Sequence, residues 1–445
     1  MSLRDHQGLG LSAGRPASVE RYAEAVQLLH GYFGNPLAII DAVLAEDPEF
    51  LAGHALRAAL MVTTSERRAV PELRRSVEAG EALIARGRGN ERERAQIAAA
   101  RAWLDGDFER ATDRYNLIAL EHPRDGLAIQ IAHLCNFYLG RSTWLRDHVA
   151  AALPHHARHE PLYGFLHGML AFGLEECHEF ERAEAAGRLA LDCNARDPWA
   201  VHAVAHCFEM QGRLADGSAW LEQREGDWAP DNFFAIHNYW HLALFHLEGG
   251  DVQRTLALYD GNIRGSNSEV NLDLVDASAL LWRLMLAGAD VRERFGALAE
   301  VWQRVDELGY YGFNDWHAAM AYAGAGQSAQ VERVIRGLTA GMSSGAPGRA
   351  EVLSACRGFA AFAAQDHRRA VDELFAVRPF AARFGGSHAQ RDVLELTLIE
   401  AALRDGQHAL ARSLCEARRA RKPDSPGPRM LLARLTAAPE RSGAA

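Results

Sequence analysis

The chain has 445 residues, of which 48% are hydrophobic, and it carries a formal net charge of −10 at pH 7. This composition can form a sizeable core, and because Arg and Lys are interspersed with Glu and Asp without forming a basic stripe, we expect no nucleic-acid partner. The six cysteines show no CxxC spacing, and no charged-then-apolar leader opens the chain. We therefore expect a reduced, cytoplasmic protein with no transmembrane segment and no membrane partner.

In chain order, the sequence predicts three segments. Residues 1–19 are rich in Gly, Ser and Pro and are expected to be a flexible N-terminal segment. Residues 20–435 are expected to form a single helical array, with a candidate loop between repeats at Gly341–Gly348. Residues 436–445 are short, polar and Ala-rich, and we expect a flexible C-terminal tail there.

A short turn pattern recurs along the array: a polar turn with Gly, Asp or His, then a hydrophobic residue and, three residues later, a small one. Its spacing of roughly 34 to 40 residues matches the period of tetratricopeptide repeats. Between the turns, apolar residues recur with the helical period, and alternating β-branched runs are scarce. We therefore predict an all-α fold, a tetratricopeptide-type superhelical solenoid of antiparallel helix pairs with one continuous core. The pattern occurs at Gly106–Ala111, His178–Ala183, Gly212–Gly217 and Gly250–Val252, and less regularly at Gln365–Ala370 and Gly406–Ala411.

Two histidine pairs at helical spacing lie in the middle of the array. His202 and His206 are i, i+4 in one predicted helix, and His237 and His241 are i, i+4 in the first helix of the next repeat. Both rings of a pair therefore project from one side of the helix. Since the first helix of each tetratricopeptide repeat lines the concave surface, we expect a polar pocket at these imidazoles.

Other side chains share the predicted stripe. Glu209 and His317, counted back from the glycine turn after each helix, fall on the same side as the paired histidines. Four tryptophans also lie on this stripe, away from the interhelical position of the repeat's own tryptophan, so we expect them to form the wall of the pocket. They are Trp199, Trp240, Trp282 and Trp316.

The chain resembles the tetratricopeptide repeat protein 38 family from about Ser18 to about Arg421. The segments that carry the resemblance are Trp199–Gly212, His237–Leu244, Asn314–Ala318 and Gly385–Asp392. The resemblance implies the solenoid fold, and it says little about activity because the family has little settled biochemistry. The chain departs from the expected pattern at Cys207 and Phe208, where two aliphatic residues would be typical.

Three interpretations of the stripe remain open. The imidazoles could be polar groups that hydrogen-bond to their neighbours and have no further role. Alternatively, His202, His206, His237 and His241 could bind a divalent transition metal such as zinc, iron, manganese or copper, with Glu209 as an oxygen ligand or general base. A metal-free acid/base site is the third possibility, in which the four histidines, Glu209 and His317 are the catalytic groups. No HExxH motif accompanies the pairs.

Further candidates surround the stripe. His388, Arg391 and Asp392 lie at a predicted helix start, where backbone amides and a guanidinium could hold a carboxylate or phosphate of a ligand. Asp276 lies at the edge of the stripe, and we include it among the ligand-binding residues, although a solvated carboxylate is an equal interpretation. Glu175 has the same position relative to its turn as Glu209, and Asp315 could cap its own helix; whether these two belong to the site stays open.

Two classes of function follow from these residues. The first is an enzyme, a hydrolase-like acid/base or metal-assisted catalyst that binds a small polar metabolite between the tryptophans and the histidines. The second is a non-catalytic scaffold that binds a peptide or protein in its groove. Peptide-carboxylate grooves rely on Lys, Arg and Asn, whereas this stripe carries His, Glu and Trp, so the sequence favours a small-molecule ligand over a peptide or protein partner.

Overall fold

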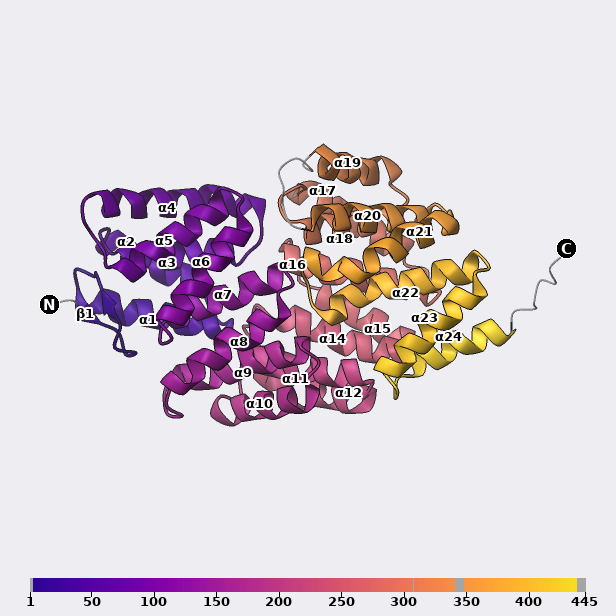
Figure 1. Cartoon of the computed structure of the whole chain (residues 1–445), viewed down its shortest axis with the longest axis horizontal. Helices are drawn as coiled ribbons and strands as arrows, with labels where there is room; N and C mark the ends of the chain where they lie inside the picture. Colours follow the sequence, from indigo (N-terminus) through magenta and orange to yellow (C-terminus); the bar gives the residue numbers. More distant parts are fainter. Residues whose placement is uncertain (1–2, 307, 341–347, 438–445) are drawn as a thin grey trace.

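The computed structural model describes residues 3–306, 308–340 and 348–437. Within these ranges the chain is all-α, apart from an isolated bridge and the two short strands β1 (Leu3–Arg4) and β2 (Gly10–Leu11), which pair antiparallel. Antiparallel helix pairs follow one another and curl into a tetratricopeptide-type superhelical solenoid, as the turn spacing predicts (Figure 1). None of the described helices has the length and apolar character that crossing a membrane requires.

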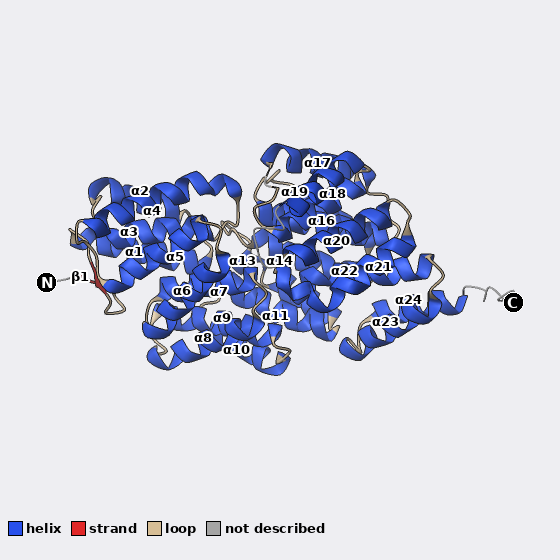
Figure 2. Cartoon of the chain, turned by 45° about the horizontal axis from the view of Figure 1, so that its top comes forward, coloured by secondary structure: helices blue, strands red, loops and turns tan. Residues whose placement is uncertain are grey.

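Helices account for nearly all of the described chain (Figure 2). The first helix of most pairs is buried on several sides, and the second buries a single face. The reason is position: most first helices pack against the first helix of at least one neighbouring repeat as well as against their own partner. The inner helices are α1 (Pro16–Gly31), α3 (Leu51–Val62), α5 (Glu91–Leu104), α7 (Gly126–Tyr138), α9 (Pro161–Glu176), α11 (Pro198–Gln211), α14 (Ala235–Glu248), α16 (Asn271–Leu286), α18 (Gly312–Gly324), α20 (Arg349–Ala363) and α22 (His388–Arg404).

The outer helices cover this inner layer. They are α2 (Pro36–Glu46), α4 (Val70–Ala85), α6 (Phe108–Glu121), α8 (Ser142–Ala152), α10 (Phe180–Cys193), α12 (Leu214–Gln223), α15 (Val252–Leu258), α17 (Arg292–Val305), α19 (Ser328–Ala340), α21 (His367–Val377) and α23 (His408–Arg421). Shorter elements and the last helix complete the chain: η1 (Arg67–Ala69), η2 (Leu153–His155), α13 (Glu225–Trp228), η3 (Tyr259–Ile263), η5 (Arg378–Phe384) and α24 (Pro426–Ala437).

The N-terminal residues contact the body of the solenoid. After the β1–β2 hairpin, Ser12 N donates to Glu93 Oε1 (2.9 Å) and Gly14 N donates to Asp47 Oδ2 (2.8 Å), and α1 begins at Pro16. The described part of the expected flexible segment therefore has defined hydrogen bonds. The expected tail lies outside the described residues beyond Ala437, as does the candidate loop except for its last residue. The division of the chain into three segments stays a prediction.

Residues far apart in the sequence meet where the superhelix turns back on itself. Near the N-terminus, Asn314 Nδ2 donates to Ser65 O (3.2 Å), so the loop after α3 reaches the start of α18. At the other end, Gly212 ends α11 with φ +77°, and a Cβ there would lie 2.5 Å from Ser425 N. A glycine is therefore needed for the α23–α24 turn to approach α11. In the same region, α22 packs against both α16 and α11.

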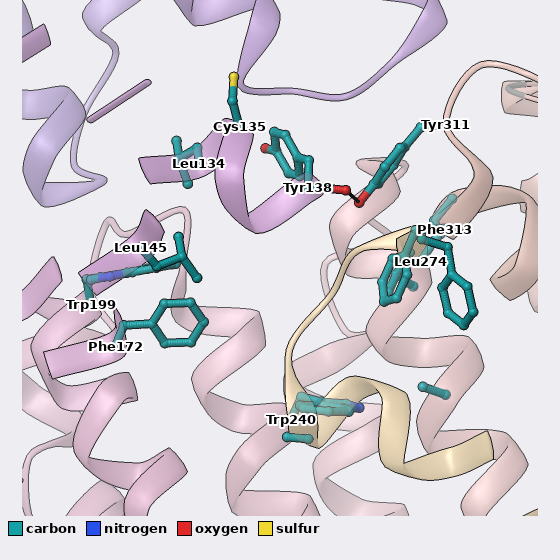
Figure 3. Packing of buried hydrophobic residues seen from close by; sticks show 14 of the residues in the cluster. Leu134, Cys135, Tyr138, Leu145, Phe172, Trp199, Trp240, Leu274, Tyr311 and Phe313 are labelled. Atoms are coloured by element: carbon teal, nitrogen blue, oxygen red, sulfur yellow. Dashed lines mark hydrogen bonds between the residues drawn. The ribbon is translucent and has the colours of Figure 1, made fainter. Parts of the chain in front are cut away.

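Aromatic side chains fill the space inside the curl. Figure 3 shows Tyr311 beside Tyr138, and the Tyr311 hydroxyl donates to Tyr138 O at 2.9 Å. Phe172 lies edge-on to Trp199, with ring centroids 4.9 Å apart, while Trp240 lies further along the inner layer (Figure 3). The histidine-bearing part of α11 is next to these rings, so its environment is largely apolar.

Candidate metal centre

The four paired histidines come together between α11 and α14. One ring nitrogen from each of His202, His206, His237 and His241 lies within 4.8 Å of the others. Nε2 of His202 and Nε2 of His237 are 3.1 Å apart. His237 is partly exposed, with 15% of its side chain accessible, and the other three rings are buried. Four nitrogens must converge in this way if the two i, i+4 pairs are to bind one metal ion.

Two carboxylates orient two of these rings. Asp276 Oδ2, on α16, accepts from Nδ1 of His237 at 2.7 Å, and Glu209 Oε2 accepts from Nδ1 of His241 at 2.9 Å. When Nδ1 carries the proton, Nε2 keeps its lone pair and can bind a cation. A carboxylate that holds the second nitrogen of a ligating histidine is a common feature of metal sites.

The surroundings keep the imidazoles neutral. Burial lowers the pKa of His206 to about 4. Burial, together with the neighbouring histidines, also holds the pKa values of His202 and His241 well below their ordinary range. Near neutral pH these three rings therefore carry no charge, which is the form in which histidine binds metals.

Glu175 approaches the site from α9 in a different way. Its Oε2 lies 3.3 Å from His206 Nδ1, but the contact lacks hydrogen-bond geometry, and neither carboxylate oxygen has a hydrogen-bond partner among the described residues. Burial and the adjacent Glu176 raise the pKa of Glu175 well above its ordinary value. Burial would also raise the pKa of Glu176, but His388 and Arg391 outweigh this effect and lower it.

Two of the predicted tryptophans border the histidines. Trp240 stacks on the His237 ring, with centroids 5.3 Å apart and planes at 14°. Trp199 lies 5.1 Å from the His202 ring, and Phe234 covers both of these histidines, with centroids 4.9 Å from each. These aromatic rings separate the polar cluster from solvent.

The other predicted members of the stripe lie elsewhere. His317 Nδ1 donates to Phe313 O (2.8 Å) within its own helix, and its ring is not among the four that converge. Trp282 Nε1 donates to Thr397 Oγ1 (3.0 Å), and its ring packs against Phe359. Trp316 also packs against Phe359. The structure therefore places these three residues in the core between α16, α18, α20 and α22, because the C-terminal helices fold back over that part of the stripe.

At the predicted anion-binding site at the start of α22, the chain's own carboxylates take the place of a ligand. His388 N donates to Glu176 Oε1 (2.8 Å), and Arg391 Nη2 donates to Glu176 Oε2 (3.3 Å). Asp392 instead forms a two-point ion pair with Arg418, which holds the pKa of this buried carboxyl below its ordinary range although burial alone would raise it. Asp315 Oδ1 accepts from Gly309 N (2.7 Å), away from the histidines.

Two buried cations near the site were not predicted from the sequence. The Arg283 guanidinium donates to Ala279 O (3.2 Å) and Ala389 O (2.6 Å) and forms no ion pair within the described part of the chain. Lys422 is 3% exposed, and its Nζ has no hydrogen-bond partner among the described residues. The position of Arg283 was available as a signal: it follows Asp276 by two helical turns, and therefore lies on the same face of α16.

A groove adjoins the histidine cluster on the side of these cations. It has a volume of about 610 Å³ and lies between α14, α16 and the helices from α22 to α24. Glu209, which bonds His241, is part of its wall, and so is Arg283. The rest of the lining combines apolar side chains with three further carboxylates and three further arginines. The leucines are Leu244, Leu247, Leu286, Leu396 and Leu431, and the charged residues are Glu248, Asp392, Glu400, Arg404, Arg418 and Arg434.

No protein-family model matches the chain. Among solved structures, the human IFIT1 dimer with PPP-AAAA aligns over 98% of this chain and 97% of its own, at 12% identity and a TM-score of 0.44. The same dimer with m7Gppp-AAAA aligns over 98% of this chain and 97% of its own, at 13% identity and a TM-score of 0.45. The TPR domain of P58(IPK) aligns over 88% of this chain and 99% of its own, at 12% identity and a TM-score of 0.19. Likeness of this degree concerns the helical-repeat fold and not the activity.

These comparisons contradict the partner expected from the sequence. A small molecule was favoured and nucleic acid was excluded, whereas the IFIT1 structures hold capped or triphosphate-bearing oligonucleotides. The exclusion rested on the absence of a basic stripe in the sequence. That argument is insufficient for a solenoid, because cations from separate repeats, such as Arg283 and Lys422 here, can come together after folding.

Proposed function

We propose that the chain is a helical-repeat scaffold whose inner layer is held together by a divalent transition metal bound to His202, His206, His237 and His241. The observation that carries the proposal is the convergence of four imidazole nitrogens within 4.8 Å of one another. These residues belong to two of the four segments that resemble the tetratricopeptide repeat protein 38 family, and membership of that family is part of the proposal.

The spacing and the chemistry of the donors fit such an ion. Four ligands at about 2.05 Å from a tetrahedral zinc ion lie about 3.3 Å from one another. The 3.1 Å between Nε2 of His202 and Nε2 of His237 is close to this value, and the other donor nitrogens lie within 4.8 Å of one another. Imidazole ligands suit zinc, copper, iron and nickel, and Asp276 and Glu209 hold two of the rings in the required tautomer.

A site of this kind favours the scaffold over the enzyme. Four protein ligands fill a tetrahedral ion, whereas catalytic zinc keeps one position for water or substrate. Trp199, Trp240 and Phe234 also cover the rings. A metal here would therefore link α11 to α14, and thus two neighbouring repeats, so we assign it a stabilising role rather than a hydrolytic one.

The test is the metal content of protein purified without a metal-affinity step. We expect close to one tightly bound transition metal per chain at this centre, and its loss in His206→Ala and His241→Ala. His246→Ala is the matched control, since His246 lies on the same helix as His241 but contacts Glu222. Wild-type protein that is metal-free and that fails to bind added Zn²⁺, Fe²⁺, Mn²⁺ or Cu²⁺ would refute the proposal.

Arg283 supports a second candidate function, the binding of a peptide that carries a free carboxylate. A buried guanidinium without an ion pair is costly unless an anion joins it, and this one lies in the wall of the groove. The leucines beside it suit apolar side chains of the same peptide. We expect peptides with a free C-terminal carboxylate to bind more tightly than their amides, and Arg283→Gln to remove the difference. Equal affinities, or binding of an oligonucleotide alone, would contradict this function.

A further inference from the structure

The contact between Glu175 and His206 differs from the two other carboxylate–histidine contacts of the centre. Asp276 and Glu209 receive a hydrogen bond from Nδ1 at 2.7 and 2.9 Å. Glu175 Oε2 lies 3.3 Å from Nδ1 of His206 without the geometry of a hydrogen bond. A proton on Nδ1 accounts for the contacts of Asp276 and Glu209 with their histidines. It does not account for the contact between Glu175 and His206.

Glu175 is also the least compensated carboxylate near the histidines. It is fully buried, and among the described residues neither of its oxygens accepts a hydrogen bond. A buried carboxylate without donors is strongly disfavoured unless a cation lies against it. The adjacent Glu176 is directed to the same place: one oxygen of each glutamate and one nitrogen of His206 lie within 4.8 Å of one another.

The separation of 3.3 Å is the distance expected between two ligands of one metal ion. Donor atoms at about 2.1 Å from a cation are about 3.0 to 3.4 Å apart at octahedral or tetrahedral angles. Glu176 is in turn held by the backbone N–H of His388 (2.8 Å) and by Arg391 (3.3 Å). Ligating carboxylates are commonly fixed by such outer hydrogen bonds, which orient them for the ion.

We propose that a second divalent cation binds to Glu175, Glu176 and Nδ1 of His206, so that the centre holds two metal ions with the His206 imidazole between them. This inference rests on the proposed function, and it assigns Nε2 of His206 to the first ion because Nδ1 faces Glu175. When both ring nitrogens bind metal, the imidazole releases its N–H proton to solvent and becomes an imidazolate. The donor set of two carboxylates and one nitrogen suits Zn²⁺, Mn²⁺ or Fe²⁺. Three protein ligands leave this ion a coordination position for water, which the first ion lacks.

The number of ions bound is the decisive measurement. Full-length protein is stripped with a chelator, saturated with Co²⁺ and passed through a desalting column, and the metal is counted by elemental analysis. We expect two Co²⁺ per chain for the wild type and one for Glu175→Gln, which keeps the shape of the side chain and removes its charge. His237→Ala should lose the first ion and retain the second. Glu181→Gln, an exposed substitution on α10, is the control and should keep two.

The outcomes separate this inference from the proposed function. One Co²⁺ in both the wild type and Glu175→Gln overturns the second ion and leaves the four-histidine site intact. No bound Co²⁺ in the wild type overturns both. Because the wild-type count needs no variant, a folding defect in Glu175→Gln cannot obscure the answer. Electron paramagnetic resonance gives a second readout: two Co²⁺ ions joined through an imidazolate should show magnetic coupling, and Glu175→Gln should abolish it.

Discussion

At the scale of single residues, the partners of the two ring nitrogens distinguish one buried histidine of this chain from another. Nδ1 of His241 donates to a carboxylate on the neighbouring inner helix α11, while its Nε2 has no hydrogen-bond partner among the described residues. His317 is equally buried, but its Nδ1 donates to Phe313 O of its own helix. Nε2 of His317 also has no hydrogen-bond partner among the described residues, but only His241 lies beside other imidazole nitrogens with which it could share a cation.

His317 should make the protein sensitive to acid. Burial lowers the pKa of its imidazole to about 3, whereas the unfolded chain has the ordinary value of about 6.5. The unfolded state therefore binds the proton first, and stability is lost as the pH falls below about 6.5. This group alone should lower the free energy of unfolding by about 2 kcal/mol between pH 7 and pH 5. Urea unfolding of the wild type and His317→Asn at both pH values measures the effect.

The variant should be less stable at pH 7 but show a smaller loss on acidification. His159→Asn, at an exposed position, serves as the control and should follow the wild type. An unchanged pH dependence in His317→Asn would show that this histidine is protonated in the folded state as easily as in the unfolded one.

Asp276 should act on the proposed metal through His237, and should tune the affinity for the ion rather than create the site. Asp276→Asn weakens the acceptor that fixes the ring, and loss of such a partner typically costs about 10- to 100-fold in metal affinity. Isothermal titration of chelator-treated protein with Zn²⁺ gives the dissociation constants. Asp273→Asn is the control, because Asp273 bonds Ser268 instead. Equal affinities for the two variants would argue against an orienting role for Asp276.

At the scale of elements, the helices that carry the site could be predicted, and their surroundings only in part. The convergence of His202, His206, His237 and His241 depends on i, i+4 spacing in two consecutive inner helices, which is local geometry. The location of Trp282 depends on Thr397, 115 residues away on α22, and no periodicity in α16 reveals that contact. Charge patterning likewise does not show which buried cations meet, because that is decided by how the superhelix closes.

The start of α11 should matter for stability as well. Asp197 Oδ1 accepts from the backbone N–H groups of Trp199 and Ala200, both at 3.0 Å, and so caps the helix that carries two of the proposed ligands. Asp197→Ala leaves these amides unsatisfied and should lower the free energy of unfolding by about 1 to 2 kcal/mol. Asp251→Ala, at the exposed cap of outer helix α15, should cost less. Chemical denaturation of both variants tests the order.

At the scale of the whole molecule, closure of the superhelix depends on a few tight approaches between distant segments. The site lies close to α22, which packs against α11 and α16, so Glu176, one of the two glutamates near His206, is held from the C-terminal repeats. The loop before α22 must pass close to the end of α7, and Gly385 makes this possible. Its φ is +87°, and a Cβ there would lie 2.2 Å from the Tyr311 hydroxyl and 2.4 Å from Tyr138 O.

Gly385→Ala should therefore destabilise the protein much more than a glycine replacement at an unconstrained turn. Backbone strain costs about 1 to 3 kcal/mol at such a φ, and the displacement of a backbone carbonyl adds to it, so we expect a loss of about 3 kcal/mol or more. Gly406→Ala is the matched control: its φ is +77°, and a Cβ would meet nothing within 4 Å. That variant should lose only about 1 to 2 kcal/mol. Equal losses in urea unfolding would mean that the approach of η5 to α7 contributes nothing to closure.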